Sequence, residues 1–88
     1  MAKYRKRPVV IEAMHFDGSI ECALLIGEWS GGKVQKHTFM GDFTGVMHIE
    51  TLEGTMTVIR WDWVIRGAQN EFYPCRPDIF EATYEAAE

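Results

Sequence analysis

The sequence predicts a small α+β domain: an antiparallel β-meander or half-barrel with one packed helix and a short C-terminal helical turn. Two observations lead to this prediction. Apolar residues recur with helical spacing only over residues 20–29, whereas most of the remaining chain shows period-two or β-branched patterns. With 88 residues, 47% of them apolar and 12% aromatic, the chain has the size of one domain (residues 1–88) and is too apolar to be disordered.

The N-terminal part is predicted to hold one strand and the helix. Residues 9–16 are apolar on both faces, which is typical of a central strand or of one covered by a helix. Asp17 or Ser19 can cap the helix predicted over residues 20–29, and the Gly31-Gly32 pair can end it. The helix is expected to bury a stripe with i, i+3, i+4, i+7 spacing, formed by Cys22, Leu25, Ile26 and Trp29.

From residue 33 onward the pattern is that of short strands. They are predicted over residues 34–39, 46–52, 55–59, 63–66 and 71–73. Glu53-Gly54 is expected to form a hairpin turn, because glycine readily adopts a positive φ. A helical turn that opens at Pro77-Asp78 places Phe80 and Tyr84 at positions i and i+4, on one face.

The charge distribution separates the two ends of the chain. The net charge is -4 and the pI is near 5.3, yet residues 1–7 hold four cations and no acid, while residues 78–88 hold acids and no cation. A basic arm can bind nucleic acid, but domains that bind it by charge are normally basic overall. We favour an arm that pairs with the acidic tail of its own or another chain. No apolar run reaches the length of a membrane span or signal peptide, so a soluble, cytoplasmic protein is expected.

The histidines do not show the pattern of a metal site. His15, His37 and His48 lie on three separate predicted strands, without the close paired spacing of zinc ligands. We therefore expect no metal and no cofactor.

Residues for catalysis are equally sparse. Cys22 is interpreted as a core residue, and Cys75 as a more exposed thiol whose pKa the neighbouring Arg76 can lower; an ordinary reduced thiol is the favoured interpretation. Carboxylates near the hairpin, among them Glu50 and Asp62, are interpreted as solvated. The sequence does not favour an enzyme.

The densest unusual segment is Arg60-Trp61-Asp62-Trp63. Two tryptophans two apart on a strand point to the same face, and tryptophan with arginine is typical of protein–protein hot spots. The same residues can stack bases, or one or both tryptophans can cover the core. With a second patch around Tyr73, the sequence predicts a partner-binding surface formed by Arg60, Trp61, Trp63, Arg66, Tyr73 and Arg76.

Three stretches of the chain resemble a widespread group of small bacteriophage and prophage proteins. They are Lys3-Tyr4-Arg5-Lys6-Arg7-Pro8-Val9-Val10-Ile11-Glu12-Ala13, Thr51-Leu52-Glu53-Gly54-Thr55-Met56-Thr57-Val58, and Glu71-Phe72-Tyr73-Pro74-Cys75-Arg76-Pro77-Asp78-Ile79-Phe80-Glu81-Ala82-Thr83-Tyr84-Glu85. The family usually carries Pro-Gly-Asp before the Val-Ile-Arg-Gly strand, where this chain has Arg60-Trp61-Asp62. The resemblance implies a phage-encoded accessory protein in an infected bacterial host, and it implies no particular activity.

A shorter likeness concerns the end of the chain. An aromatic residue before Pro74, followed by Phe80 and Tyr84, is similar to the ending of phage anti-defence sponge proteins that sequester cyclic nucleotide signals.

These observations predict a non-enzymatic module that binds and modulates a host or phage protein. A second hypothesis is an oligomeric sponge for a nucleotide-type signal, in which aromatic residues stack the base and Arg66 or Arg76 binds phosphate. Such a sponge would need a pocket, which so small a domain builds most readily between copies of itself. A third hypothesis is nucleic-acid binding through the basic arm, which the acidic composition does not favour.

Overall fold

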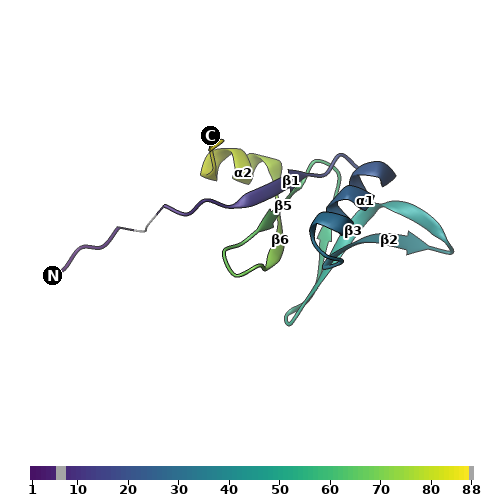
Figure 1. Cartoon of the computed structure of the whole chain (residues 1–88), viewed down its shortest axis with the longest axis horizontal. Coiled ribbons are helices and arrows are strands. Elements are labelled where there is room, and N and C mark those ends of the chain that lie inside the picture. The colour runs from purple at the N-terminus through teal and green to yellow at the C-terminus, as the bar shows by residue number, and fades with distance from the viewer. Residues whose placement is uncertain (6–7, 88) are drawn as a thin grey trace.

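The computed structural model describes residues 1–5 and 8–87 and confirms a small α+β fold with antiparallel strands and a short C-terminal helix. The strands form two three-stranded sheets, one in the order β1-β5-β6 and one in the order β2-β3-β4. The elements in chain order are β1 (Glu12–His15), α1 (Ile20–Trp29), β2 (Val34–Phe39), β3 (Asp42–Thr51), β4 (Gly54–Val58), β5 (Trp63–Arg66), β6 (Phe72–Cys75) and α2 (Pro77–Thr83). Figure 1 shows α1 beside the β2-β3-β4 sheet and α2 beside the β1-β5-β6 sheet.

The β2-β3-β4 sheet is a local meander, as predicted, but β3 starts earlier than residue 46. Met40 and Gly41 both have positive φ, 52° and 86°, so the chain reverses within two residues and Phe39 pairs with Asp42. Positive φ at both central positions matches the twist of the flanking strands, which lets β3 begin at once after the turn.

The β1-β5-β6 sheet joins distant parts of the chain. β1 pairs with β5 so that His15 lies opposite Trp63, and β5 pairs with β6 so that Arg66 lies opposite Phe72. The strand predicted over residues 9–16, as central or covered by a helix, is shorter than expected: it covers residues 12–15 and lies at the edge of its sheet rather than at the centre. The four residues of β5 set this length, since they pair only with residues 12–15.

The main core lies between α1 and the inner faces of the two sheets. Its fully buried side chains include Phe16 after β1, Ile26 on α1, Met47 on β3, Val58 on β4 and Val64 on β5. Residues from every layer therefore meet in one cluster, which fixes the two sheets relative to each other.

Helix α1 buries a stripe that overlaps the predicted one only in part: Ile26 and the flanking Ala23 are buried as expected, and Cys22 and Trp29 pack against the core. Leu25 is 60% exposed, whereas Ala23, Ile26 and Ser30 are buried. These three residues and Gly27 also have i, i+3, i+4, i+7 spacing, one position away from the predicted set. The C-terminal end of the helix is tied to β2, because the Val34 N–H donates to Ser30 Oγ at 3.0 Å. This contact is consistent with Ser30 facing the core while Leu25 faces solvent.

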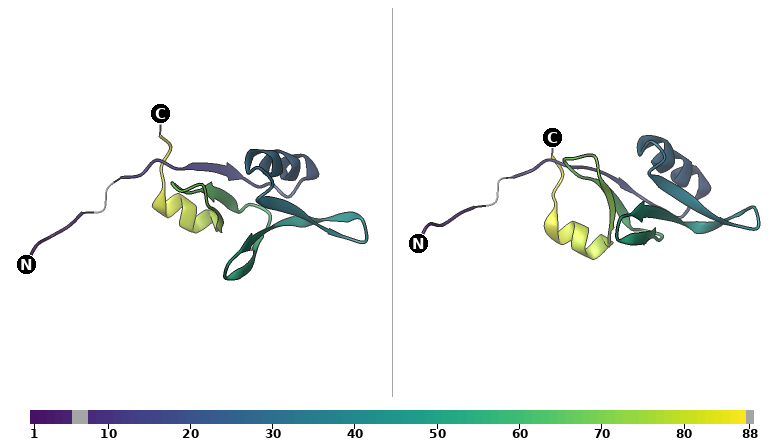
Figure 2. Two further views of the ribbon diagram at one scale, coloured as in Figure 1. Left: turned by 60° about the horizontal axis from the view of Figure 1, so that its bottom comes forward. Right: turned by 90° about the horizontal axis from the view of Figure 1, so that it is seen from below.

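The second face of the β1-β5-β6 sheet is covered by α2. Ile65 on β5 is buried there, although it is not part of the main core cluster, and Phe80 of α2 stacks on Trp63. In the two views of Figure 2, the described N-terminal residues extend away from the folded body. Across residues 1–5 and 8–87, no helix has the length and apolar character needed to cross a membrane.

Candidate functional site

The segment between β4 and β5 forms a tight turn that presents Trp61. The Asp62 N–H donates to the Ile59 carbonyl oxygen at 3.0 Å, which closes a four-residue turn. Trp61, the third residue of this turn, has a φ of 75°, whereas the φ of Arg60, the second residue, is not positive. A positive φ at the third position alone is the signature of a type II turn, which favours proline and then glycine at its centre. The chain has arginine and tryptophan in these places. The turn is anchored to the end of β1, because the Trp61 N–H donates to the Phe16 carbonyl oxygen at 2.7 Å.

The turn holds Trp61 in a strained backbone conformation. A residue with a Cβ in the left-handed region costs about 1–2 kcal/mol, which glycine avoids. Trp61 is nevertheless 49% exposed, so this strained position leaves a large part of the ring in contact with solvent. Trp61 is not on a strand, and the predicted shared strand face with Trp63 is therefore not the reason that these residues lie close together.

The two tryptophans are joined instead through a histidine from β1. The His15 ring stacks on Trp63 with centroids 4.4 Å apart, and it tilts against Trp61 at 5.8 Å. The Trp61 carbonyl oxygen lies 2.8 Å from His15 Nε2. On the other side, Trp63 stacks on Phe80 at 4.1 Å, and Phe80 contacts Tyr84 at 5.1 Å. We call this set the aromatic column: Trp61, His15, Trp63, Phe80 and Tyr84.

Arg60 extends the column at its exposed end. Its guanidinium lies 4.9 Å from the centre of the Trp61 ring, a cation–π contact. Its aliphatic stem crosses Gly18, where an added Cβ would lie 3.1 Å from Arg60 Cγ. Beside it is an open hollow of about 430 Å³ lined by Arg60, Gly18, Asp17, Ser19 and Gly45.

Asp62 and Arg76 hold the turn from beneath. Asp62 is 2% exposed, which corrects the interpretation that it is solvated. Its carboxylate accepts hydrogen bonds from the Ile59 N–H at 3.1 Å and from Arg76 Nη1 at 3.2 Å. A buried carboxylate needs such partners, so Asp62 fixes the shape of the turn while much of the Arg76 side chain stays at the surface.

The other two predicted site residues lie apart from Trp61. Arg66 is on the opposite face of β5 from Trp63, where it donates to Glu12 at 2.9 Å and to the Trp29 carbonyl oxygen at 2.6 Å and lies over the Trp29 ring. Tyr73 is half-buried on β6. Burial raises the pKa of its hydroxyl, and the neighbouring Tyr84 raises that pKa further. The structure therefore brings Arg60, Trp61, Trp63 and Arg76 together and engages Arg66 in the packing of α1.

The thiols are free and do not show activation. Burial raises the pKa of Cys75, and Asp62 and Asp78 raise it further. The alternative in which Arg76 lowers the pKa of Cys75 does not agree with this direction, and the Arg76 guanidinium is directed to Asp62. Burial also raises the pKa of Cys22.

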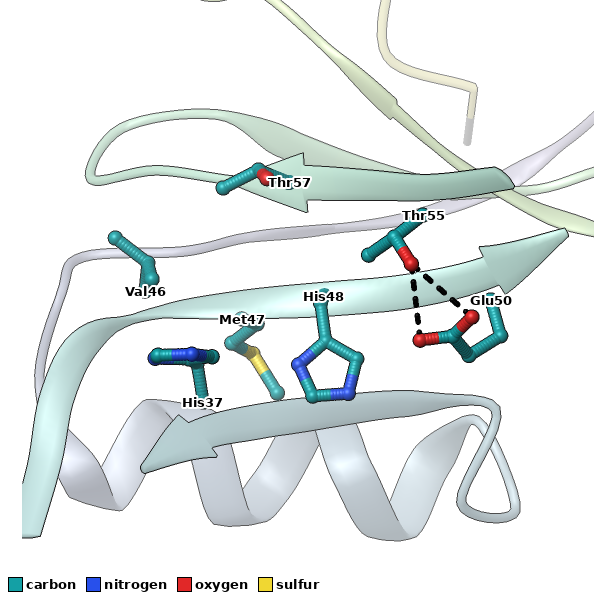
Figure 3. Close-up of a pocket in the computed structure, with 7 residues that line it drawn as sticks. All are labelled: His37, Val46, Met47, His48, Glu50, Thr55 and Thr57. Atoms are coloured by element: carbon teal, nitrogen blue, oxygen red, sulfur yellow. Dashed lines mark hydrogen bonds between the residues drawn. The ribbon is translucent and has the colours of Figure 1, made fainter. Parts of the chain in front are cut away.

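A second open hollow, of about 320 Å³, lies on the β2-β3-β4 sheet (Figure 3). His37 and His48 meet there edge to face with centroids 6.0 Å apart, and the Thr55 hydroxyl donates to the Glu50 carboxylate at 3.0 Å. Within the described part of the chain, no group of three or more His, Cys, Asp or Glu side chains is placed to hold a metal ion. The Thr55 and Thr57 hydroxyls and the His37 and His48 rings line this open hollow.

Comparisons of the chain with models of protein families, with curated proteins and with solved structures found no match. The resemblance to phage proteins therefore stays a prediction.

Proposed function

We propose that the protein is a non-enzymatic interaction module that binds and modulates a host or phage protein through Arg60 and Trp61. The phage origin and the cytoplasm of an infected bacterium as its location belong to the same proposal, and they rest on the sequence resemblance. The observation that carries the proposal is the setting of Trp61: a large aromatic side chain is half exposed at a backbone position where glycine would fit without strain.

Strain of this kind persists where the surrounding structure imposes it, and it is concentrated at functional sites. Arg60 and His15 contact the Trp61 ring and restrict its motion. A ring that is already ordered loses less conformational entropy when a partner covers it. Tryptophan and arginine are also the residue types that contribute most to protein–protein binding, so the surface has the chemistry of a hot spot.

The nucleotide-sponge alternative receives less support from the same contacts. His15 and Phe80 both lie parallel to the Trp63 ring, at 4.4 and 4.1 Å, so they occupy its two faces and leave no room for a base. A base on Trp61 would have to displace the Arg60 guanidinium from the ring. Arg66, which that hypothesis assigns to phosphate, is engaged by Glu12 and the Trp29 carbonyl oxygen.

Affinity capture from a lysate of the bacterial host tests the proposal. Three baits are compared: the wild type, Trp61→Gly and Phe39→Ala. Trp61→Gly removes the indole without adding backbone strain. Phe39→Ala is the control, because it removes an exposed aromatic side chain from the end of β2. We expect a protein that the wild type and Phe39→Ala enrich equally and that Trp61→Gly enriches at least about tenfold less. Equal enrichment by all three baits contradicts the proposed surface, and a nucleotide carried by the purified wild type would support the sponge instead.

A further inference from the structure

The β1-β5-β6 sheet has an open edge along β1. The Phe16 N–H donates to the Asp62 carbonyl oxygen and the Phe16 carbonyl oxygen accepts from Trp61, so the backbone of Phe16 faces the β5 side. Because backbone groups alternate in direction along a strand, Ala13 directs its groups to the open side, and residues 9 and 11 do the same where the strand is continued to residue 9. The opening ends at His15, whose carbonyl oxygen accepts a hydrogen bond from Cys22 Sγ on α1.

The chain before β1 has the composition of a strand, but none of the strands in the described residues lies beside it. Val9, Val10 and Ile11 are consecutive β-branched apolar residues, and they lie beyond Glu12, which pairs with the last residue of β5. Val10 is 82% exposed. Natural sheet edges are usually protected by lysine, proline or a covering segment. Here Pro8 stands before the apolar run, while Val9, Val10 and Ile11 themselves hold neither a charge nor a proline and can pair with another chain.

We propose that two copies of the chain pair antiparallel through residues 9–13, so that their β1-β5-β6 sheets join into one continuous sheet. A two-fold axis at Ile11 places Ile11 opposite Ile11 and Val9 opposite Ala13 of the second copy. Residues 9, 11 and 13 then exchange the backbone hydrogen bonds that neither copy makes alone. Identical antiparallel strands are complementary to each other by symmetry, which makes a second copy the fitting occupant.

The charge distribution favours the same occupant. Residues 1–7 carry four basic residues, whereas residues 8–88 hold all thirteen acids and the other five basic residues, a net charge of -8. Two copies in antiparallel pairing bring the basic N-terminal segment of each towards the acidic body of the other, where Asp17 and Glu21 at the start of α1 are exposed. The proposal does not depend on the binding role of Trp61, which lies outside the paired segment.

Sedimentation equilibrium of the full chain, with variants at the edge, tests this dimer. In the proposed register Val10 lies opposite Glu12 of the second copy, and symmetry forms this pair twice. Val10→Glu therefore places like charges together and Val10→Lys places opposite charges together, while neither changes a residue that is buried in the single chain. We expect the dimer Kd of Val10→Glu to exceed that of Val10→Lys at least about tenfold. Leu52→Glu, at the exposed β3–β4 turn, should leave the Kd at the wild-type value.

A backbone variant checks the hydrogen bonds directly. Ile11→Pro removes the central N–H, which no strand uses in the single chain, and it should give a folded monomer with an unchanged circular dichroism spectrum. The proposal is overturned by a wild type that sediments as a monomer at every soluble concentration, or by equal Kd values for Val10→Glu and Val10→Lys. A dimer that survives Ile11→Pro, or that Leu52→Glu weakens equally, would also overturn it.

Discussion

Replacing Trp61 with glycine should leave the protein more stable than replacing it with alanine, the reverse of the order found at most positions in strands and helices. Both substitutions remove the same indole, together with its contacts to Arg60 and His15. The lost packing therefore cancels when the two variants are compared, and what remains is the response of the backbone.

The magnitude follows from the φ of 75° at this residue. Alanine keeps the left-handed strain, about 1–2 kcal/mol, whereas glycine releases it and loses about 0.5–1 kcal/mol through its greater freedom in the unfolded chain. The glycine variant should thus be more stable by about 0.7 kcal/mol, which corresponds to a Tm difference of about 3–6 °C in a domain of this size.

Urea denaturation of the two variants measures the difference as a shift of the midpoint at constant m value. Thr57, an exposed residue within β4, provides the control, because Thr57→Gly should there be less stable than Thr57→Ala. If Trp61→Ala proves as stable as Trp61→Gly, Trp61 is not held in the left-handed conformation and the argument that the fold presents it under strain fails.

Three further predictions follow from the surroundings of the site. Asp62→Asn should lower the free energy of unfolding by about 1–3 kcal/mol, because it weakens a buried charged contact with Arg76. Asp42→Asn, at an exposed position, should change the free energy of unfolding by less than about 0.5 kcal/mol. Equal urea midpoints for the two variants would contradict this prediction. The pKa of the Cys75 thiol is raised from its ordinary value of 9.0, so the protonated thiol is favoured in the folded state and the resulting stability is lost as pH rises above that value. Iodoacetamide should therefore alkylate Cys75 more slowly than free cysteine at neutral pH, and faster alkylation would count against the assigned burial. Phe80→Ala should accelerate hydrogen exchange in α2, which has no fully buried residue of its own, and leave α1 unchanged; equal exchange in both proteins would show that the stack does not hold α2.

Local chemistry explains which elements the sequence predicts well. Both ends of α1 are confirmed because neighbouring residues determine them: Ser19 Oγ accepts from the Cys22 N–H at 3.1 Å, and Gly31 follows the helix with a φ of 66°. The strand predicted over residues 63–66 is also confirmed, as β5. Because successive side chains of a strand alternate between its two faces, Trp63 and Arg66 lie on opposite faces of β5. The expected grouping of Arg66 with Trp63 overlooked that alternation.

Contacts between distant parts of the chain were beyond the sequence pattern. His15 joins the aromatic column because β1 pairs with β5, and no turn or spacing near residue 15 specifies this partner. The left-handed backbone at Trp61 did have a signal. The resembled phage family has Pro-Gly at residues 60 and 61, and that dipeptide is typical of the type II turn that the structure contains.

The central claim is that a partner protein covers the Trp61 surface, and photo-crosslinking from that residue tests it most directly. A benzophenone amino acid at position 61, next to Arg60, should crosslink the partner that affinity capture enriches, whereas the same probe at position 39 on the far hairpin should not. Crosslinks from position 39 but not from position 61 would contradict the account and place the binding surface on the β2–β3 hairpin.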